Sequence, residues 1–281
     1  MPPAALALVL GAAVFHSAWN LVLKSEPRRL EASLLALGAA VSLSAPALFL
    51  HPITELPAHA WLLVLLSGLF ETAYLVVLTA AYEIGDLSLV YPIARGVAPL
   101  VVVPLAVLVL GERLSWPGLA GIALVVSGIF ATMQWRGDAR GGGLRAVALA
   151  ALTGVTIAGY SLVNKVGVQV VPVTLYAFLV LAIDLALLTV VLRLRGDFRW
   201  PRPGAPRWRA VAIGVLMLGA YLGILTALSL APVSYVVAGR EVSIVITALA
   251  GALVLGERHS GRRTAGAMVI FAGLVVIALS R

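Results

Sequence analysis

Cysteine is absent from this sequence of 281 residues. Its absence excludes disulfide bonds and metal sites built from thiolate ligands. Charged residues are scarce, because they make up 11% of the chain, whereas a soluble domain carries about 25%. Hydrophobic residues account for 62%. So few charged groups cannot cover a water-facing surface, and we therefore expect an integral membrane protein embedded in a lipid bilayer.

Motifs of several enzyme classes are also missing. The sequence contains no phosphate-binding GxxxxGK[ST] pattern, no zinc-binding HExxH pattern and no GxSxG turn that would carry a serine nucleophile. The histidines are scattered along the chain, at His16, His51, His59 and His259. We therefore do not expect an enzyme, and we expect neither a metal site nor a cofactor.

The formal net charge of +8 could suggest a nucleic-acid partner. Most basic residues, however, lie in short segments between apolar runs, as the positive-inside rule requires of a membrane protein. With the N-terminus outside, 15 of the 20 Lys and Arg residues fall in inside loops. Arginine outnumbers lysine 18 to 2, as is typical of a GC-rich bacterial genome. We expect a multi-pass protein of the bacterial inner membrane, with both termini periplasmic and no nucleic-acid partner.

Ten apolar runs of about 20 residues follow one another, each long enough to cross the hydrocarbon core of a bilayer. We predict spans at Pro3–Leu23, Leu30–Leu50, His59–Tyr82, Ser88–Leu110, Trp116–Trp135, Leu144–Val166, Val173–Leu194, Trp208–Leu230, Val233–Leu255 and Gly261–Ser280.

An internal repeat organises these spans. LVLGERLSWPGLAG (Leu108–Gly121) returns as LVLGERHSGRRTAG (Leu253–Gly266), with nine of fourteen positions identical. The chain therefore divides into two five-span repeats, residues 1–140 and 141–281. Five is an odd number, so the second repeat enters the bilayer from the opposite face. The predicted fold is an all-α membrane protein of ten transmembrane helices, arranged as two inverted repeats within one transmembrane domain.

The repeated segment carries the residues of a helix–loop–helix junction. A glycine suits the end of one helix and a serine the start of the next, and we interpret the glutamate between them as a structural loop residue. These residues are Gly111, Glu112 and Ser115 in the first repeat, and Gly256, Glu257 and Ser260 in the second. Glycines at a seven-residue spacing predict close packing of the helices that follow. They are Gly121 and Gly128, and Gly266 and Gly273.

Polar and aromatic side chains inside the spans are the candidates for function, because polar groups in hydrocarbon are costly and usually face an interior cavity. Three pairs share a helix face at a spacing of four residues: His16 and Asn20, Tyr91 and Arg95, and Tyr160 and Asn164. The predicted substrate-binding residues are His16, Trp19, Asn20, Tyr74, Tyr91, Arg95, Tyr160, Asn164, Tyr221, Tyr235 and Arg240. Pro92, Pro99 and Pro104 are expected to interrupt the span that holds Arg95, which would mark the binding region.

The charged candidates have more than one interpretation. Arg95 and Arg240 could extend toward the membrane surface, could pair with Glu241 or with helix-end carbonyls to hold the halves together, or could bind a substrate carboxylate. Glu71 and Glu241 are possible proton sites, although Glu71 could equally be a neutral, hydrogen-bonded side chain. Asp184 stands alone in its span, and the sequence indicates no partner for it.

Two five-span repeats, each with LGER before a glycine-rich last span, resemble the drug/metabolite transporter superfamily, EamA-type. The resemblance implies a ten-helix transporter whose central cavity is lined by spans 1, 3, 4, 6, 8 and 9. Spans 2 and 7 would be peripheral, and spans 5 and 10 would pack together. Within the superfamily, the size and the cavity aromatics are similar to YddG-type aromatic amino-acid exporters.

We therefore expect a secondary transporter that exports small metabolites, with amino acids, including aromatic ones, as its substrates. It would work by alternating access as a facilitator, in contact with the lipid bilayer and as a monomer. Two alternatives stay open within the same class, a proton-coupled multidrug antiporter and a nucleotide-sugar antiporter. Outside that class, the alternatives are a membrane scaffold and a membrane enzyme.

Overall fold

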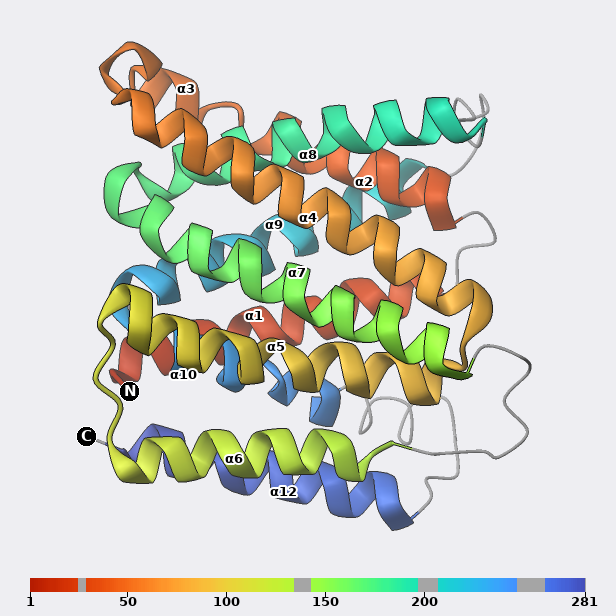
Figure 1. The fold of residues 1–281 in the computed structure, drawn as a ribbon. Coiled ribbons are helices and arrows are strands. Elements are labelled where there is room, and N and C mark those ends of the chain that lie inside the picture. Colours follow the sequence, from red (N-terminus) through yellow and green to blue (C-terminus); the bar gives the residue numbers. More distant parts are fainter. Residues whose placement is uncertain (25–28, 134–142, 197–206, 247–260, 281) are drawn as a thin grey trace.

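The computed structural model describes residues 1–24, 29–133, 143–196, 207–246 and 261–280 (Figure 1), and within these ranges every regular element is a helix. Seven of the helices are long and apolar enough to cross a membrane, and two shorter apolar helices cover Trp116–Ala131 and Thr264–Leu279. The elements are α1 (Pro3–Lys24), α2 (Arg29–Ser44), α3 (Ala47–Leu50), a 3₁₀ helix η1 (Ile53–Glu55), α4 (Ala58–Ile84), α5 (Leu87–Leu110), α6 (Trp116–Ala131), α7 (Gly143–Val170), α8 (Val173–Arg195), α9 (Arg207–Leu230), α10 (Val233–Arg240) and α12 (Gly261–Leu279).

The interruptions of the spans lie at other places than the sequence predicts. The proline-rich α5 is continuous over Leu87–Leu110 despite Pro92, Pro99 and Pro104, so the expected break in this span is wrong. Neighbouring helices can re-satisfy the carbonyls that a proline leaves free, and α5 packs against α7, α6 and α10. The second span breaks instead between α2 and α3, and Pro46 lies immediately before α3.

The ninth predicted span is discontinuous. Helix α10 ends at Arg240, Glu241 lies in a turn, and helical structure resumes over 242–246. The remainder of the predicted span to Leu255 lies outside the described residues. A helix that stops within a membrane leaves backbone carbonyls without helical partners, which is tolerated where the break lines a cavity or is buried in protein.

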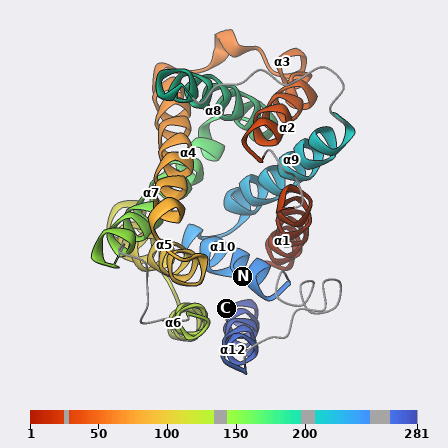
Figure 2. The ribbon, with the colours of Figure 1, turned by 90° about the vertical axis from the view of Figure 1, so that its right-hand side faces the viewer.

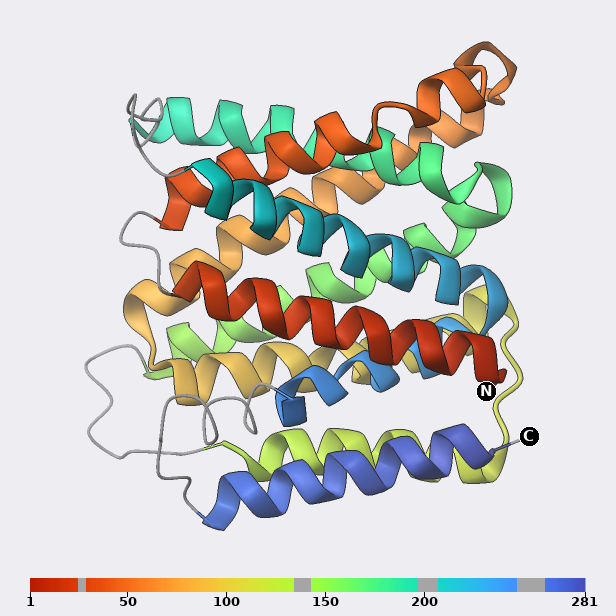
Figure 3. The ribbon, with the colours of Figure 1, turned by 180° about the vertical axis from the view of Figure 1, so that it is seen from behind.

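Helices of the first repeat pack in pairs with helices of the second repeat. Helix α4 lies along α7, and the corresponding pair formed by α9 and α1 packs in the same way; Figure 3 shows α9 beside α1. Helix α7 begins at the end of the molecule where α1 finishes, so the two cross in opposite directions (Figure 1). This arrangement agrees with the predicted inversion. The predicted boundary at residue 140 lies outside the described residues.

Both termini lie at the same end of the molecule. The Met1 amino group donates to the carbonyl of Ser280 at 2.9 Å. Seen end-on, the helices surround a central region, with α6 and α12 set apart as a pair (Figure 2). Termini at one end agree with an even number of membrane crossings.

The α6–α12 pair is closely packed through the repeated glycines. A Cβ atom added at Gly121 would lie 2.9 Å from the Gly273 carbonyl oxygen, and one added at Gly128 would lie 2.8 Å from the Gly266 carbonyl oxygen. Both distances are shorter than a van der Waals contact. The glycines therefore allow the backbones of the fifth and tenth spans to touch, which confirms the predicted close packing within the chain.

The loop between α5 and α6, in the first repeat, contacts the second repeat. Gly111 ends α5 with a left-handed φ of 67°, and the Ser115 hydroxyl accepts from the Gly118 amide at 3.3 Å. The Glu112 carboxylate accepts from the Ser234 amide at 3.3 Å and from the Ser234 hydroxyl at 2.7 Å, so it caps the start of α10. Glu112 thus has the structural role that the sequence predicts. Its repeat counterpart Glu257 lies outside the described residues.

We predict that Gly128→Ala destabilises the fold, although alanine is the better helix former. Its Cβ would lie 2.7 Å from the Ile270 backbone nitrogen, and overpacking of this kind costs about 1–3 kcal/mol. The apparent melting temperature in detergent should fall. Gly11→Ala is the matched control, because a Cβ at Gly11 meets nothing within 4 Å. Equal melting temperatures for the two variants would contradict the close α6–α12 contact.

Candidate functional site

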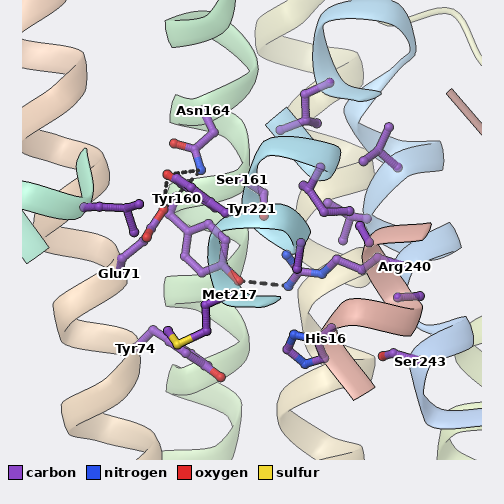
Figure 4. A pocket seen from close by; sticks show the side chains of 18 of the residues that line it. His16, Glu71, Tyr74, Tyr160, Ser161, Asn164, Met217, Tyr221, Arg240 and Ser243 are labelled. Carbon is purple, nitrogen blue, oxygen red and sulfur yellow. Dashed lines mark hydrogen bonds between the residues drawn. The ribbon is translucent and has the colours of Figure 1, made fainter. Parts of the chain in front are cut away.

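A cavity of about 200 Å³ lies in the region that the helices surround. One water molecule needs about 10–15 Å³ by this measure, so there is room for a small solute. The polar, aromatic and sulfur-containing side chains that line it are His16, Trp19, Glu71, Tyr74, Arg95, Tyr160, Ser161, Asn164, Asp184, Met217, Tyr221, Arg240 and Ser243. Figure 4 shows Arg240, His16 and Ser243 on one side of this pocket and Glu71 on the other.

Most of the predicted site residues line this cavity, and four do not. The cavity-lining ones are His16, Trp19, Glu71, Tyr74, Arg95, Tyr160, Asn164, Tyr221 and Arg240. Outside the lining, the Asn20 amide donates to the His16 carbonyl at 2.7 Å, within its own helix. The Tyr91 ring lies 5.3 Å from the Arg95 guanidinium carbon, and Glu241 is fully buried beneath the cavity-lining arginines.

Tyr235 was predicted to bind substrate, but it makes a contact between helices outside the cavity lining. Its hydroxyl oxygen accepts from the Ser115 amide at 3.2 Å, where α6 begins, and the ring packs against Gly118. Sequence position alone could not reveal this, because the contact joins residues 120 positions apart. In the structure Tyr235 fastens α10 to the first repeat.

Spans 2 and 7 also reach the cavity. Leu37 of α2 and Leu181 and Asp184 of α8 belong to its lining. The family resemblance implied that these two spans are peripheral, and the structure corrects that expectation. The Asp184 carboxylate, which had no partner in the sequence, accepts from the Thr72 hydroxyl at 2.7 Å. The sequence signal that could have placed Asp184 in the cavity was its position as an isolated acidic residue in an apolar span.

One side of the cavity is cationic. The Arg95 guanidinium binds the Glu241 carboxylate at 3.1 Å, and the Nε atom of Arg240 lies 3.5 Å from the same oxygen, Oε1. Arg95 comes from the first repeat and the other two residues from the second, so this contact joins the repeats. Two guanidinium groups share one carboxylate, which leaves one positive charge uncompensated within this cluster.

His16 extends this cationic side with a hydrogen-bond donor. Its Nε2 atom lies 3.0 Å from the Nη2 atom of Arg95. Arginine has no acceptor, so Nε2 must accept, and in the neutral ring the proton then resides on Nδ1. The tautomer assigned by this contact gives His16 an Nδ1–H donor.

Aromatic rings connect the two sides of the cavity. The Tyr160 hydroxyl accepts from Arg240 at 2.9 Å, and its ring meets Tyr74 edge to face at 6.1 Å between centroids. His16 and Trp19 make a similar edge contact at 5.1 Å. Such rings offer surfaces for an apolar or aromatic solute and for an ammonium group.

The other side of the cavity is acidic. The Oε1 atom of Glu71 accepts from the Tyr221 hydroxyl at 2.8 Å and from the Asn164 amide at 3.2 Å. Asn164 in turn accepts from Ser67 at 2.5 Å and from Tyr176 at 3.0 Å. The Asn164 side chain is thus occupied with positioning Glu71. Ser67, Tyr176 and their roles were not indicated by the sequence.

Lys165 does not contribute to the cavity. Its ammonium group donates to the carbonyls of Leu228 at 2.6 Å and Ala231 at 2.9 Å, where α9 ends. A cation at a helix C-terminus is favourable. Lys165 and Glu112 therefore bind the facing ends of α9 and α10, on either side of Pro232.

Inverted helical repeats around a central cavity are the architecture of secondary transporters. The comparisons with known proteins agree. Residues 3–134 and 144–279 each match the EamA-like transporter family, one match for each repeat, and the chain belongs to this family. Members of the family are transporters.

The fold itself has been seen in solved structures. One of them, described only as a crystal structure of a protein, superposes with a TM-score of 0.76 at 18% sequence identity, over 99% of this chain and 98% of the other. At this identity the likeness shows the fold alone. No curated protein matches the sequence.

We predict that Glu241→Gln strongly destabilises the protein, because two buried guanidinium groups would lose their shared carboxylate. Removing one partner of a buried ion pair costs about 3–5 kcal/mol. Glu55→Gln in the exposed η1 element is the matched control, and thermal unfolding in detergent is the measurement. If both variants unfolded at the temperature of the unchanged protein, the Arg95–Glu241 contact would not hold the repeats together.

Proposed function

We propose that this protein is a secondary transporter that exports amino acids, including aromatic ones, through the central cavity. It works by alternating access as a facilitator, in a bacterial inner membrane, with both termini periplasmic. We infer an amino-acid substrate from the cavity lining, which combines guanidinium groups on one side, carboxyl groups on the other side and aromatic walls. An amino acid presents a carboxylate, an ammonium and, in the aromatic cases, a ring.

The arrangement of the repeats supports alternating access. Cavity residues come from both halves of the chain, and the halves pack against each other along whole helices and also share polar links such as Arg95–Glu241 and Glu112–Ser234. Rocking of one half against the other would open the cavity to either face in turn. The break in the ninth span at Glu241 offers a point where this motion can be absorbed.

A second candidate is a proton-coupled antiporter of organic cations. It is favoured by the two cavity carboxyls, Glu71 and Asp184, because such groups can exchange a proton for a cationic solute. Among the described residues, the cavity has no cluster of free basic side chains such as a sugar nucleotide's phosphates would require. Arg95 and Arg240 share Glu241, and Lys165 is directed at the end of α9.

The test is uptake of labelled amino acids into liposomes that hold only this protein, with and without a pH gradient. We expect aromatic amino acids to move down their own gradient whether or not a pH gradient is present. Flux that requires the pH gradient would replace the facilitator by the antiporter. No amino-acid flux under either condition would overturn the proposed substrate class.

In the same liposomes, Tyr74→Ala should weaken uptake of aromatic amino acids. The variant removes a ring that lines the cavity, and burial of such a side chain contributes about 1.5–3 kcal/mol, so we expect roughly a tenfold loss or more in uptake efficiency. Tyr82→Ala is the matched control, because Tyr82 belongs to the same helix but does not line the cavity. Equal losses in both variants would place the substrate elsewhere.

A further inference from the structure

Three polar atoms at the break of the ninth span lack hydrogen-bond partners among the described residues. They are Nε of Arg240, Oε2 of Glu241 and Oγ of Ser243. Ser243 is 2% exposed and Glu241 fully buried, and both Arg240 and Ser243 line the cavity. Leaving a buried polar group without a hydrogen bond destabilises the folded protein. Unsatisfied groups that line a cavity therefore point to a ligand that satisfies them.

The charge of this region selects an anion. Arg95 and Arg240 carry two positive charges, and Glu241 supplies one negative charge. His16 is neutral, because its Nε2 accepts from Arg95. One positive charge remains, and the donors beside it are Nε of Arg240 and the Ser243 hydroxyl, both without hydrogen-bond partners among the described residues, together with the Nδ1–H of His16. A carboxylate, with two oxygens and one negative charge, matches this set of donors.

The opposite side of the cavity selects a cation. The hydrogen bonds that Glu71 accepts among the described residues come from neutral donors, Tyr221, Asn164 and Ser67, and all three go to Oε1. Asp184 accepts from Thr72, the residue after Glu71. Within the part of the chain that the structure describes, neither acid is paired with a basic side chain. An ammonium group would provide the missing counter-charge.

Helix α7 contacts both sides of the cavity. Tyr160 binds Arg240, and Asn164 binds Glu71. Residues four apart lie on the same face of a helix. One face of α7 therefore connects the anion-binding and cation-binding groups, which face each other across a single cavity.

We propose that the substrate is a zwitterionic α-amino acid bound in one orientation. Its carboxylate contacts Arg240, Ser243 and the Nδ1–H of His16, and its ammonium faces Glu71 and Asp184, with Tyr74 and Met217 available to its side chain. Arg240 and Glu71 then determine specificity by rejecting solutes that lack one of the two charges. This inference rests on the proposed function and assigns the polarity of the same site.

The experiment compares three probes that share a phenyl ring: phenylalanine, its amine phenethylamine and its acid 3-phenylpropionate. Binding to the purified protein is measured by calorimetry in detergent, so the result does not depend on transport. We expect phenylalanine to bind at least about tenfold more tightly than either single-charge probe, because each of those probes lacks one set of hydrogen bonds to charged groups.

Two variants should change this selectivity in opposite ways. Arg240→Gln should reduce phenylalanine binding to the level of phenethylamine, while phenethylamine binding is unchanged. Glu71→Gln should reduce phenylalanine binding to the level of 3-phenylpropionate. A purely structural role would weaken all three probes together, and that result would overturn the assignment.

Ser243→Ala separates binding from folding. The hydroxyl has no hydrogen-bond partner among the described residues, so its removal should not lower the melting temperature, but phenylalanine and 3-phenylpropionate should bind several-fold more weakly. Ser42→Ala, on the exposed face of α2, should change neither property. Equal binding of phenethylamine and phenylalanine by the unchanged protein would refute the zwitterion site and leave a transporter of organic cations. Failure of all three probes to bind would refute the amino-acid function as well.

Discussion

The structure depends on how buried charge is neutralised in a membrane. The Arg95–Glu241 ion pair joins α5 of the first repeat to the break of the ninth span in the second. Both side chains are nearly inaccessible, at 7% and 0% exposure, so neither charge has water to stabilise it. The pair therefore fixes α5 against α10. Because Glu241 is shared with Arg240, it also leaves one positive charge facing the cavity, and the proposed binding of a substrate carboxylate rests on that imbalance.

The same requirement explains the contacts around the cavity. Backbone groups at the ends of α9 and α10 would be unsatisfied in hydrocarbon, and Lys165 and Glu112 bind them with charges of the appropriate sign. The Glu112 contact connects the repeated LGE loop to the opposite half of the molecule. The α6–α12 pair, in contrast, contains close glycine contacts and no cavity residue. Helix packing and polar links thus join the halves around the cavity, and the α6–α12 pair joins them away from it through close backbone contacts.

The fold was largely predictable because two strong signals agreed. Apolar length gave the spans, and the repeat around Leu108–Gly121 gave their grouping into inverted halves. The site was predictable where a polar side chain in an apolar span faces the cavity, as with His16, Arg240 and Glu71. Contacts between distant segments were not predictable: Tyr235 reaches Ser115, and Thr72 reaches Asp184. Nor could the sequence tell that the prolines of α5 leave the helix continuous while the span with Glu241 breaks.

The absence of cysteine allows the most direct test of alternating access. A single Ala220→Cys substitution introduces one thiol into the cavity lining, and Val14→Cys provides a control on an outward-facing position of α1. In liposomes with known protein orientation, a membrane-impermeant maleimide is added to one side or the other. We predict labelling of Ala220→Cys from both sides, slowed by phenylalanine, and little labelling of Val14→Cys. Labelling of the cavity thiol from one side only, unaffected by phenylalanine, would contradict a cavity that opens to each face in turn.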